Sequence, residues 1–547
     1  MSKGAVAPSA TAVAGRAPRR RLPGLLLVPT LVAAIATALP LAYLAVRAAG
    51  AGEEALRLLW RPATAEVLSN TVGLVAVVTA GAVLIGVPLA WLVTCTDLPG
   101  RRVWSVALSL PLVIPSYVAG FAYVAAFAPG GMLPRLLGPF GVQRLPDIYG
   151  LWGAAAALTL VSYPYVLLTV RGALMGMDRS LEDAARSLGS GKPAVFARIT
   201  LPLLRPAIAA GALLVALYAL SDFGAVSLLR FDSFTRAIHT AYRAGFDRTG
   251  AVVLALVLVA LTGALLVIEA RLRGGDAHHR TGPGARRTPP TARLGRWRWP
   301  AVVFCALVAG LGLGVPVVVL GYWLARGLAA GEPLRLAAET WAAAWHSVRA
   351  SAMAAAASAA LALPIGVLSV RYRRRSTILL ERVTYLGYAL PGIVVALSLV
   401  FFGARFAGPL YQTLALLVFA YVVLFLPQAV GAVRSSVLQI SPSLEDAART
   451  LGASGARVTA QVTVPLARPG LVAGGMLVFL TAMKELPATL LLGPTGQRTL
   501  ATAVWNATSE AFFARAAAPA LVLILVAGLP MAVLVARGFG PLSRSSS

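Results

Sequence analysis

Two acidic side chains in apolar stretches are the clearest candidates for chemistry in this sequence. Asp222 and Glu485 lie in or at the end of predicted membrane spans, at matching positions 263 residues apart. Ionisable groups in such places are costly and usually face a cavity or a partner. Two carboxylates facing each other would suit a hard trivalent cation, which favours oxygen ligands. The structural alternative is that Lys484 beside Glu485, and Arg230 and Arg236 near Asp222, form ion pairs that only anchor outer loops.

Other candidate chemistry in the sequence is weak. The run GSGK at 189–192 resembles a phosphate-binding loop, but the Walker spacing fails and Pro193 stands where Ser or Thr is required. No convincing catalytic triad or metal-ligand cluster is visible. Cys95 and Cys305 are isolated, which favours buried thiols over a disulfide. We therefore expect no enzymatic activity, no cofactor and no fixed metal site.

The elements that must hold these residues are membrane helices. Of the 547 residues, 58% are hydrophobic and 12% are charged, whereas soluble domains carry about 25% charged residues. Apolar stretches of about 20 residues recur along the chain, the length of helix that spans a hydrocarbon core of about 30 Å. Backbone groups in lipid must bond internally, so these stretches are predicted to be helices. The sequence predicts an all-α polytopic membrane protein with spans near 24–46, 67–94, 103–127, 148–170, 204–228, 249–270, 300–325, 347–370, 383–403, 410–433, 468–492 and 516–536.

The distribution of basic residues predicts the orientation of the chain. The formal net charge of +28 would suggest nucleic acid as the partner of a soluble protein. Here most Lys and Arg residues fall in loops on one side, as cytoplasmic loops do. We therefore predict a multi-pass membrane protein with both termini in the cytoplasm and no nucleic-acid partner. Counted from residue 204 at about 1.5 Å per residue, Asp222 then lies about 27 Å along its span, near the outer mouth.

The chain contains two copies of one six-span unit. SLEDAARSLG at 180–189 matches SLEDAARTLG at 443–452 in nine of ten positions, at an offset of 263, and earlier prolines pair at an offset of 276. An even number of spans per unit makes both copies face the same way, so this is a parallel repeat. The predicted division is a basic tail at 1–22, a first half at 23–270, an Arg/Gly/Pro-rich linker at 271–299, a second half at 300–540 and a tail at 541–547.

The repeated segment predicts a helix–turn–helix on the cytoplasmic surface. In residues 171–206, Glu182 precedes Arg186 by four positions, a favourable helical pair. Gly189 supplies a left-handed stop, and Pro193 suits the first turn of a second helix. One such segment could simply lie on the membrane interface as an amphipathic loop. Two nearly identical copies at matching places favour a paired partner beneath the membrane.

Both copies resemble the EAA loop of binding-protein-dependent ABC importer permeases, and we call them the EAA-like loops. The matching residues are Glu182, Ala184, Ala185, Gly189 and Pro202 in the loop 171–206, then Glu445, Ala447, Ala448, Gly452 and Pro465 in the loop 434–469. Asp183 and Asp446 stand where the family often has Ala. In that family the loop forms the coupling helix that docks on the ATPase. The resemblance covers the whole chain and implies the type I ABC importer permease fold, two copies of a cytoplasmic ATPase subunit and an external substrate-binding protein.

A second resemblance concerns the substrate. Residues 220–242 and 480–505, which contain SDFG and KELPAT, are similar to fused ferric iron permeases. That resemblance implies a permease subunit of the bacterial cytoplasmic membrane that passes ferric iron. Because of their places in the spans, we expect Asp222, Glu485 and Lys484 to lie along the pathway, with only transient contact between the metal and the two acids. Permeases for thiamine, phosphonate and polyamines share this architecture and stay open as alternatives. A secondary, ion-coupled transporter is a further alternative, because residues 97–102 partly match its loop signature.

Overall fold

The computed structural model describes residues 23–141, 145–177, 180–189, 191–243, 247–273, 292–330, 333–372 and 374–537. The predicted tails at 1–22 and 541–547 lie outside these residues, as does most of the predicted linker at 271–299. Within the described residues the secondary structure is helical, apart from an isolated β-bridge that joins Thr96 to Ala292.

Twelve apolar segments of the described chain correspond to the twelve predicted spans. Ten form helices long and apolar enough to cross a membrane, and two contain shorter apolar helices, at Gly392–Phe406 and Phe513–Gly528. The long helices of the first half are α1 (Gly24–Leu59), α2 (Pro62–Cys95), α6 (Leu151–Gly176), α9 (Leu201–Ser221) and α12 (Arg248–Arg273). Those of the second half are α13 (Arg298–Ala309) continuing into α14 (Val315–Ala329), α15 (Pro333–Arg371), α19 (Leu414–Gln439), α22 (Val464–Met483) and α25 (Phe513–Arg537). The predicted all-α polytopic architecture is confirmed.

Two predicted spans are broken at the acidic residues, so their prediction as single helices was wrong. The span predicted at 204–228 ends as α9 and resumes as the short α10 (Gly224–Leu228). The span predicted at 468–492 breaks in the same way between α22 and α23 (Pro487–Leu492). Asp222 and Glu485 lie at these breaks, where side-chain oxygens that bond to backbone N–H groups compete with continuation of the helix.

Two more predicted spans are divided at prolines. The span predicted at 103–127 consists of α3 (Arg101–Ala107), the 3₁₀ turn η1 (Leu110–Val113) and α4 (Ser116–Phe127). Its counterpart at 383–403 consists of α16 (Arg375–Thr384), α17 (Leu386–Ala389) and α18 (Gly392–Phe406). Pro115 precedes α4 and Pro391 precedes α18, both with extended ψ. Proline cannot supply the intrahelical N–H bond and clashes with the preceding turn, so each helix restarts at this point.

The first helix of each half packs against the other half. α1 lies along α15, α16 and α18, and the Ser398 hydroxyl donates to the Pro40 carbonyl across this contact at 2.8 Å. In the other direction α14 packs on α4, and the Tyr123 hydroxyl donates to the Leu311 carbonyl at 2.9 Å. Each of the two buried apolar cores accordingly mixes residues of both halves. The halves are therefore interlocked rather than merely linked in sequence.

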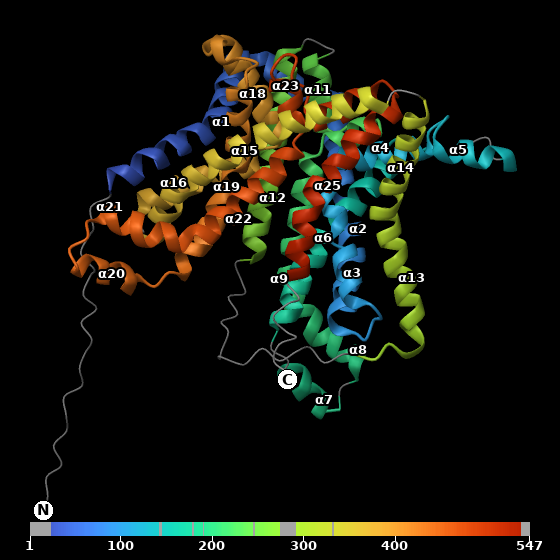
Figure 1. Cartoon of the computed structure of the whole chain (residues 1–547), viewed down its shortest axis with the longest axis horizontal. Coiled ribbons are helices and arrows are strands. Elements are labelled where there is room, and N and C mark those ends of the chain that lie inside the picture. The colour runs from blue at the N-terminus through green and yellow to red at the C-terminus, as the bar shows by residue number, and fades with distance from the viewer. Residues whose placement is uncertain are drawn as a thin grey trace, which may run out of the picture.

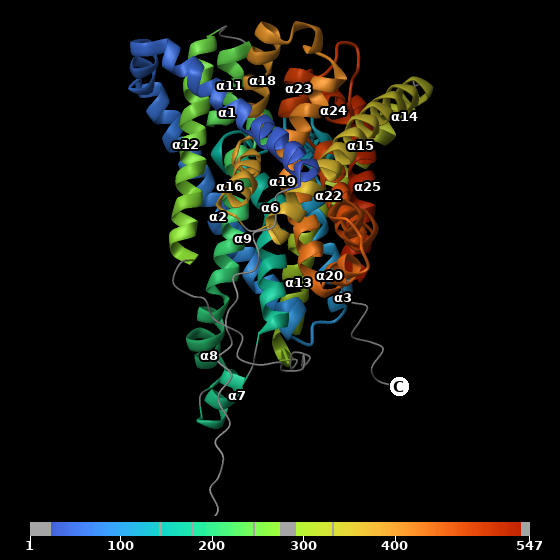
Figure 2. The ribbon, with the colours of Figure 1, turned by 90° about the vertical axis from the view of Figure 1, so that its left-hand side faces the viewer.

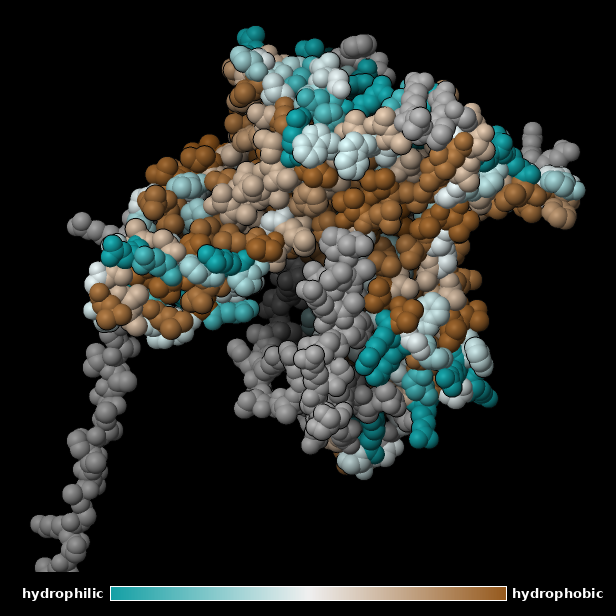
Figure 3. Space-filling view, viewed as in Figure 1, coloured by the Kyte–Doolittle hydropathy of each residue, from teal (hydrophilic) through white to brown (hydrophobic). Residues whose placement is uncertain are grey.

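The halves are joined at one end and separated at the other. In Figure 1 they meet around α11 (Phe234–Arg243), α18 and α23 and diverge toward the ends that carry α7 (Ser180–Ser187) and α20 (Pro442–Thr450). Figure 2 shows α7 and α8 (Lys192–Val195) extending beyond the end of α9. Figure 3 shows hydrophobic residues across the sides of the described helices, with hydrophilic residues gathered at the joined end and around α20. This distribution fits a protein whose sides lie in lipid.

Candidate functional site

The breaks in the two halves line one central cavity. It has a volume of about 260 Å³ and receives matching residues from the two halves, among them Asp222 and Glu485, Tyr218 and Thr481, Phe223 and Leu486, and Tyr165 and Gln428. α9 runs from the first EAA-like loop to its break, so its lining residues Leu214 and Leu217 lie on the loop side of that break. The cavity therefore extends from the two breaks toward the separated ends of the halves, and Asp222 lines this interior space.

Asp222 is held by the ends of short helices. The residue is 7% exposed, and its Oδ1 atom accepts the backbone N–H groups of Ala225 at 3.0 Å and Val226 at 3.3 Å. Ser116, at the start of α4, lines the same cavity. A helix N-terminus carries partial positive charge, which favours an anionic group. Asp222 thus has a structural role as a cap of α10 and also presents its negative charge to the cavity.

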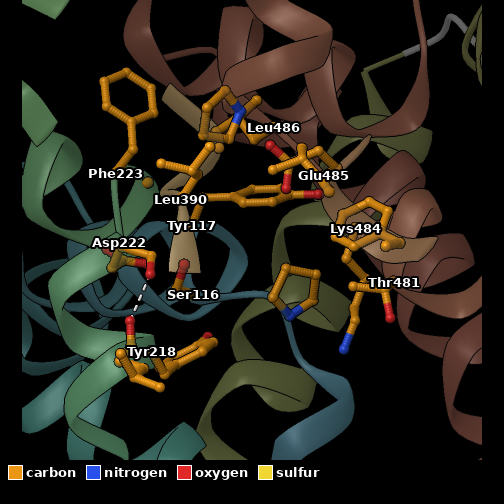
Figure 4. A pocket seen from close by; sticks show the side chains of 18 of the residues that line it. Ser116, Tyr117, Tyr218, Asp222, Phe223, Leu390, Thr481, Lys484, Glu485 and Leu486 are labelled. Carbon is orange, nitrogen blue, oxygen red and sulfur yellow. Dashed lines mark hydrogen bonds between the residues drawn. The ribbon is translucent and has the colours of Figure 1, made fainter. Parts of the chain in front are cut away.

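Glu485 occupies the equivalent place in the second half. Its Oε1 atom accepts the backbone N–H of Ala488 at 3.2 Å, which caps α23. The carboxylate also lies against the start of α18, where a Cβ added at Gly392 would come within 2.5 Å of Oε1. Glycine at this position therefore lets the helix start approach the carboxylate closely. Figure 4 shows Asp222 on one side of the cavity and Glu485 on the other, with Tyr117 between them.

The basic residues near these acids have other partners. Arg236 forms an ion pair with Asp232 at 2.8 Å, and the Arg230 guanidinium lies over the Tyr149 ring. Lys484 lines the cavity and its Nζ atom donates to the Leu112 carbonyl of the first half at 3.3 Å. Among the described residues, no ion pair involves Asp222 or Glu485. The ion-pair alternative is therefore replaced by helix capping.

The EAA-like loops have the predicted helix–turn–helix geometry. Gly189 and Gly452 stand two residues after the last residues of α7 and α20, and their φ angles are +85° and +83°, in the left-handed region that favours glycine. In the second loop, α20 begins at Pro442 and Ser441 caps it. The side chains of Ser180, Asp183 and Pro193 lie outside the described residues, as does Ser190.

A five-residue π-helical segment joins each loop to its membrane helix. These segments are η3 (Phe196–Thr200) and η7 (Thr459–Thr463), and each stands just before the Pro202 or Pro465 of the motif. A proline lacks the N–H for a bond four residues back, which favours local widening of the helix. The widened turn ends at a buried threonine, Thr200 or Thr463.

The glutamates of the two loops point inward. Glu182 is 4% exposed and Glu445 is 3% exposed. Glu182 accepts the Thr200 hydroxyl at 2.6 Å, and Glu445 accepts the Thr463 hydroxyl at 3.1 Å. The predicted helical pair is confirmed, because Glu182 lies 3.6 Å from Arg186. The matching residues of the second loop, Glu445 and Arg449, are 3.5 Å apart. Each glutamate therefore ties its loop helix to the base of the following membrane helix.

The outward faces of the loop helices are small and apolar. Ala184, Ala447 and Asp446 are exposed, and Ala185 and Ala448 are half-buried. The leucines beside the turns project furthest, with Leu188 86% exposed and Leu451 88% exposed. An exposed leucine next to alanines, on both copies, gives each loop a surface that a partner can approach closely.

Three residues of these sites were missed by sequence reasoning. Thr200 and Thr463 pair at the same offset of 263 as the loops, so the repeat itself contained the signal. Arg371 contacts Glu445 from a distant helix, with Nε 2.9 Å from Oε1. It stands opposite Cys95 at the offset of 276, so the repeat alignment could not identify it. Cys95 and Cys305 are both buried, as predicted.

Comparison with known proteins agrees with the two-unit organisation. The family of binding-protein-dependent transport system inner membrane components matches residues 82–272 and 358–537. The chain is 36% identical, over 95% of its length and 99% of the relative's, to the Fe(3+)-transport system permease protein FbpB 2 of Haemophilus influenzae. It is 33% identical to the molybdenum transport system permease protein ModB of Escherichia coli, over 34% of this chain and 82% of the relative. It is 29% identical to the sulfate transport system permease protein CysT of Synechococcus elongatus, over 41% of this chain and 81% of the relative.

The family model therefore occurs twice, once in each of the interlocked halves, and each occurrence contains one EAA-like loop and one of the two cavity acids. The relative that is similar over nearly the whole chain is itself a permease protein. These matches cover well over half of the sequence. The chain belongs to the family of binding-protein-dependent transport system inner membrane components, as a permease with two fused copies of the family unit.

Proposed function

We propose that this permease imports ferric iron through the cytoplasmic membrane of a bacterium. The observation that carries the proposal is the 36% identity over nearly the full length of both chains to an Fe(3+)-transport system permease. The central cavity supports it, because two carboxylates from opposite halves border the same space. Carboxylate oxygens are suitable ligands for a hard cation.

The site favours passage of the metal over storage. Among the described residues no group of three or more His, Cys, Asp or Glu side chains is placed to hold a metal ion. Both acids also accept backbone N–H groups, so part of their ligand capacity is already used. A trivalent ion would therefore bind the two carboxylates only weakly and dissociate again, as a transport pathway requires. Lys484, in the same cavity, limits the negative charge there.

The mechanism that we propose is alternating access driven by a separate ATPase. With the EAA-like loops and both termini in the cytoplasm, the cavity on the loop side of the breaks corresponds to an inward-facing state. Two ATPase subunits would dock on the exposed faces of α7 and α20, and ATP binding would bring those helices together. The cavity would then close on the cytoplasmic side and open toward a substrate-binding protein outside. Linkage requires that a loaded binding protein favour the same change, and so raise the ATPase rate.

An oxyanion is the second candidate substrate. Lys484 supplies one cation to the cavity, and two relatives are named as molybdenum and sulfate permeases. Those relatives match only about a third to two fifths of this chain. Two carboxylates also repel an oxyanion, so we favour ferric iron.

The test is transport by the complete complex in vesicles. The permease, its ATPase and the binding protein would be reconstituted, and uptake of radioactive iron measured with ATP inside or outside. We expect ferric-loaded binding protein to raise both ATP hydrolysis and uptake, whereas molybdate- or sulfate-loaded protein has no effect. Uptake driven by an ion gradient without ATP would instead indicate a secondary transporter. Stimulation by an oxyanion alone would refute the choice of iron.

A further inference from the structure

The first half contributes three tyrosines to the central cavity. Tyr117 of α4, Tyr165 of α6 and Tyr218 of α9 all line the space that Asp222 and Glu485 border. A phenolic oxygen, like a carboxylate oxygen, can bind a cation, but the phenol is neutral until its proton leaves. The cavity therefore offers a cation more oxygen ligands than its two acids alone.

Tyr117 is held in place by the close packing of two helix starts. It is the second residue of α4 and is 2% exposed. A Cβ added at Gly224, the first residue of α10, would come within 2.5 Å of the Tyr117 Cβ, so glycine lets these helices approach this closely. Gly120, one turn further along α4, faces Ala225 in the same way. Because Asp222 caps α10, this packing also fixes Tyr117 relative to that carboxylate.

The Tyr117 hydroxyl is buried and has no hydrogen-bond partner among the described residues. Such a group is costly, and each one in a native structure calls for an explanation. Figure 4 shows the side chain between Asp222 and Glu485, where a cation shared by the two carboxylates would lie. The Tyr163 hydroxyl is also buried without a described partner, but Tyr163 lies outside the lining of the cavity. It is therefore the position of Tyr117 that points to a ligand.

The other two tyrosines continue the path toward the loop side. Tyr218 stands four residues before Asp222, one helical turn closer to the first EAA-like loop. The rings of Tyr165 and Tyr218 lie 5.9 Å apart between their centroids, and both residues are half-buried. A cation that leaves the two acids toward the cytoplasm therefore passes these two phenols next.

The second half carries no phenol at the matching positions. The repeat offsets place these residues opposite the three tyrosines: Ile393, Gln428 and Thr481. The Thr481 hydroxyl donates to the Gln428 side-chain carbonyl at 3.0 Å, so these two groups bond to each other. An amide and an alcohol keep their protons more firmly than a phenol does. The oxygen ligands that can become anionic are thus two acids, one from each half, and three phenols of the first half.

We propose that Tyr117 binds ferric iron through its phenolic oxygen, as a third ligand beside Asp222 and Glu485, and that Tyr218 and Tyr165 receive the ion as it moves inward. The inference rests on the proposed function, because it takes ferric iron as the cargo. An iron–oxygen bond forms, the phenolic O–H bond breaks, the proton passes to water and the iron stays ferric. Return of the proton releases the ion, so the contact is transient.

This chemistry gives the cavity a means of selection. A phenol keeps its proton at neutral pH, and a strongly polarising bound cation displaces such a proton. Mg²⁺ and Ca²⁺ are instead suited to carboxylate, carbonyl and water oxygens. The tyrosines therefore strengthen binding of a trivalent ion and add little for these divalent ions.

The test uses the visible absorption that ferric phenolates have and ferric carboxylates lack. Ferric nitrilotriacetate would be added to the purified permease–ATPase complex in lipid nanodiscs. Absorption and resonance Raman spectra, which report the tyrosine ring vibrations, would then be recorded. We expect a ferric-phenolate band in the wild type. Y117F should need about tenfold more of the ferric probe for the same band, as expected for the loss of one charged contact, and Y117F/Y165F/Y218F should show no band.

Tyr163→Phe is the matched control, because it removes a buried hydroxyl that does not line the cavity. It should match the wild type in the band and in uptake of radioactive iron by vesicles, whereas Y117F should lower that uptake. Each phenylalanine variant keeps the aromatic ring, and its membrane abundance and the amount of copurified ATPase show whether it folds.

Three results would overturn the inference. They are a ferric-phenolate band that persists in the triple variant, wild-type uptake by Y117F, and no such band in a wild-type complex that imports ferric iron. If wild-type vesicles import no iron from the ferric-loaded binding protein, the proposed function fails instead. Uptake by the wild type thus distinguishes the two failures.

Discussion

At the scale of single residues, each cavity acid combines a structural contact with a free charge. Asp222 caps α10 through Ala225 and Val226, and Glu485 caps α23 through Ala488. Removing the whole side chain would therefore remove the helix cap and the negative charge together. An amide of the same shape keeps a carbonyl oxygen for the N–H groups but carries no charge. Amide substitutions thus separate the role in the pathway from the role in folding.

The first prediction uses that separation. The double variant Asp222→Asn/Glu485→Gln should abolish iron uptake, because a trivalent cation loses both anionic ligands, while the binding protein still docks and stimulates ATP hydrolysis. Uptake and stimulation would be measured on the same reconstituted vesicles. Asp222→Ala is the matched control, since it also removes the cap and should lower stability by about 1 kcal/mol. Normal uptake in the amide variant, with impairment only in the alanine variant, would reduce these acids to structural caps.

The second prediction concerns the threonines at the ends of the π segments. Thr200→Val removes the hydroxyl that bonds to the buried Glu182 carboxylate, which should cost about 1–3 kcal/mol. Thr463→Val removes the matching hydroxyl from the buried Glu445 carboxylate and should act in the same direction. The readout is copurification of the ATPase and the rate of uptake, with Thr→Ser at both positions as controls that keep the hydroxyl. Wild-type copurification and uptake in both valine variants would contradict this anchoring role of the two threonines.

At the scale of elements, the sequence predicts which segments form helices better than where those helices break. Apolar length is local information, so the twelve spans were recoverable from composition alone. The breaks at Asp222 and Glu485 depend on side chains that cap a new helix and on neighbouring helix ends. The sequence shows that Pro115 and Pro391 occupy matching positions in the two halves. It does not show that the helices are interrupted there, because that depends on the packing around the cavity. The loop geometry was recoverable because glycine, proline and charge spacing determine it locally.

The third prediction tests the loop ends. Gly189 and Gly452 have positive φ angles, and a Cβ built on either meets nothing within 4 Å. Substitution therefore challenges only the backbone conformation. Gly189→Val/Gly452→Val should destabilise each turn by roughly 1–2 kcal/mol and abolish ATPase binding. Asn tolerates the left-handed region, so the Asn double variant should retain most uptake. Full uptake in the valine variant would refute the assignment of these loops to ATPase docking.

At the scale of the whole molecule, the repeat and the charge distribution predicted two matching halves, but not their interlocking. α1 and α14 each pack against the opposite half, which is a long-range contact. A hydropathy pattern describes only local sequence, so it cannot predict such contacts. The Arg371 connection was invisible for the same reason, since it joins residues 74 positions apart. The binding-protein-dependent family assignment was recoverable because the EAA-like loops are short contiguous motifs.

The fourth prediction concerns orientation. In a background with Cys95→Ser and Cys305→Ser, single cysteines at Leu188 and Leu451 should react with an impermeant reagent only from the cytoplasm. A cysteine at Phe140, which is 81% exposed and which the proposed topology places outside, should react only from outside. The expectation follows from the excess of Lys and Arg on the loop side. Mass spectrometry after labelling of intact cells and of inverted vesicles would give the result. Labelling of either leucine position from outside would overturn the proposed topology and the inward-facing assignment with it.

The fifth prediction concerns movement of the two halves. Figure 1 shows α7 and α20 at separated ends, while the opposite ends of the halves are packed together. If ATP closes an ATPase dimer beneath them, the exposed leucines Leu188 and Leu451 must approach each other. Spin labels at these two positions, measured by pulsed electron resonance on the full complex, should shift to shorter distances when ATP is bound without hydrolysis. A distance that ATP leaves unchanged would contradict alternating access, since an ATPase cannot drive a cavity whose two coupling helices do not move.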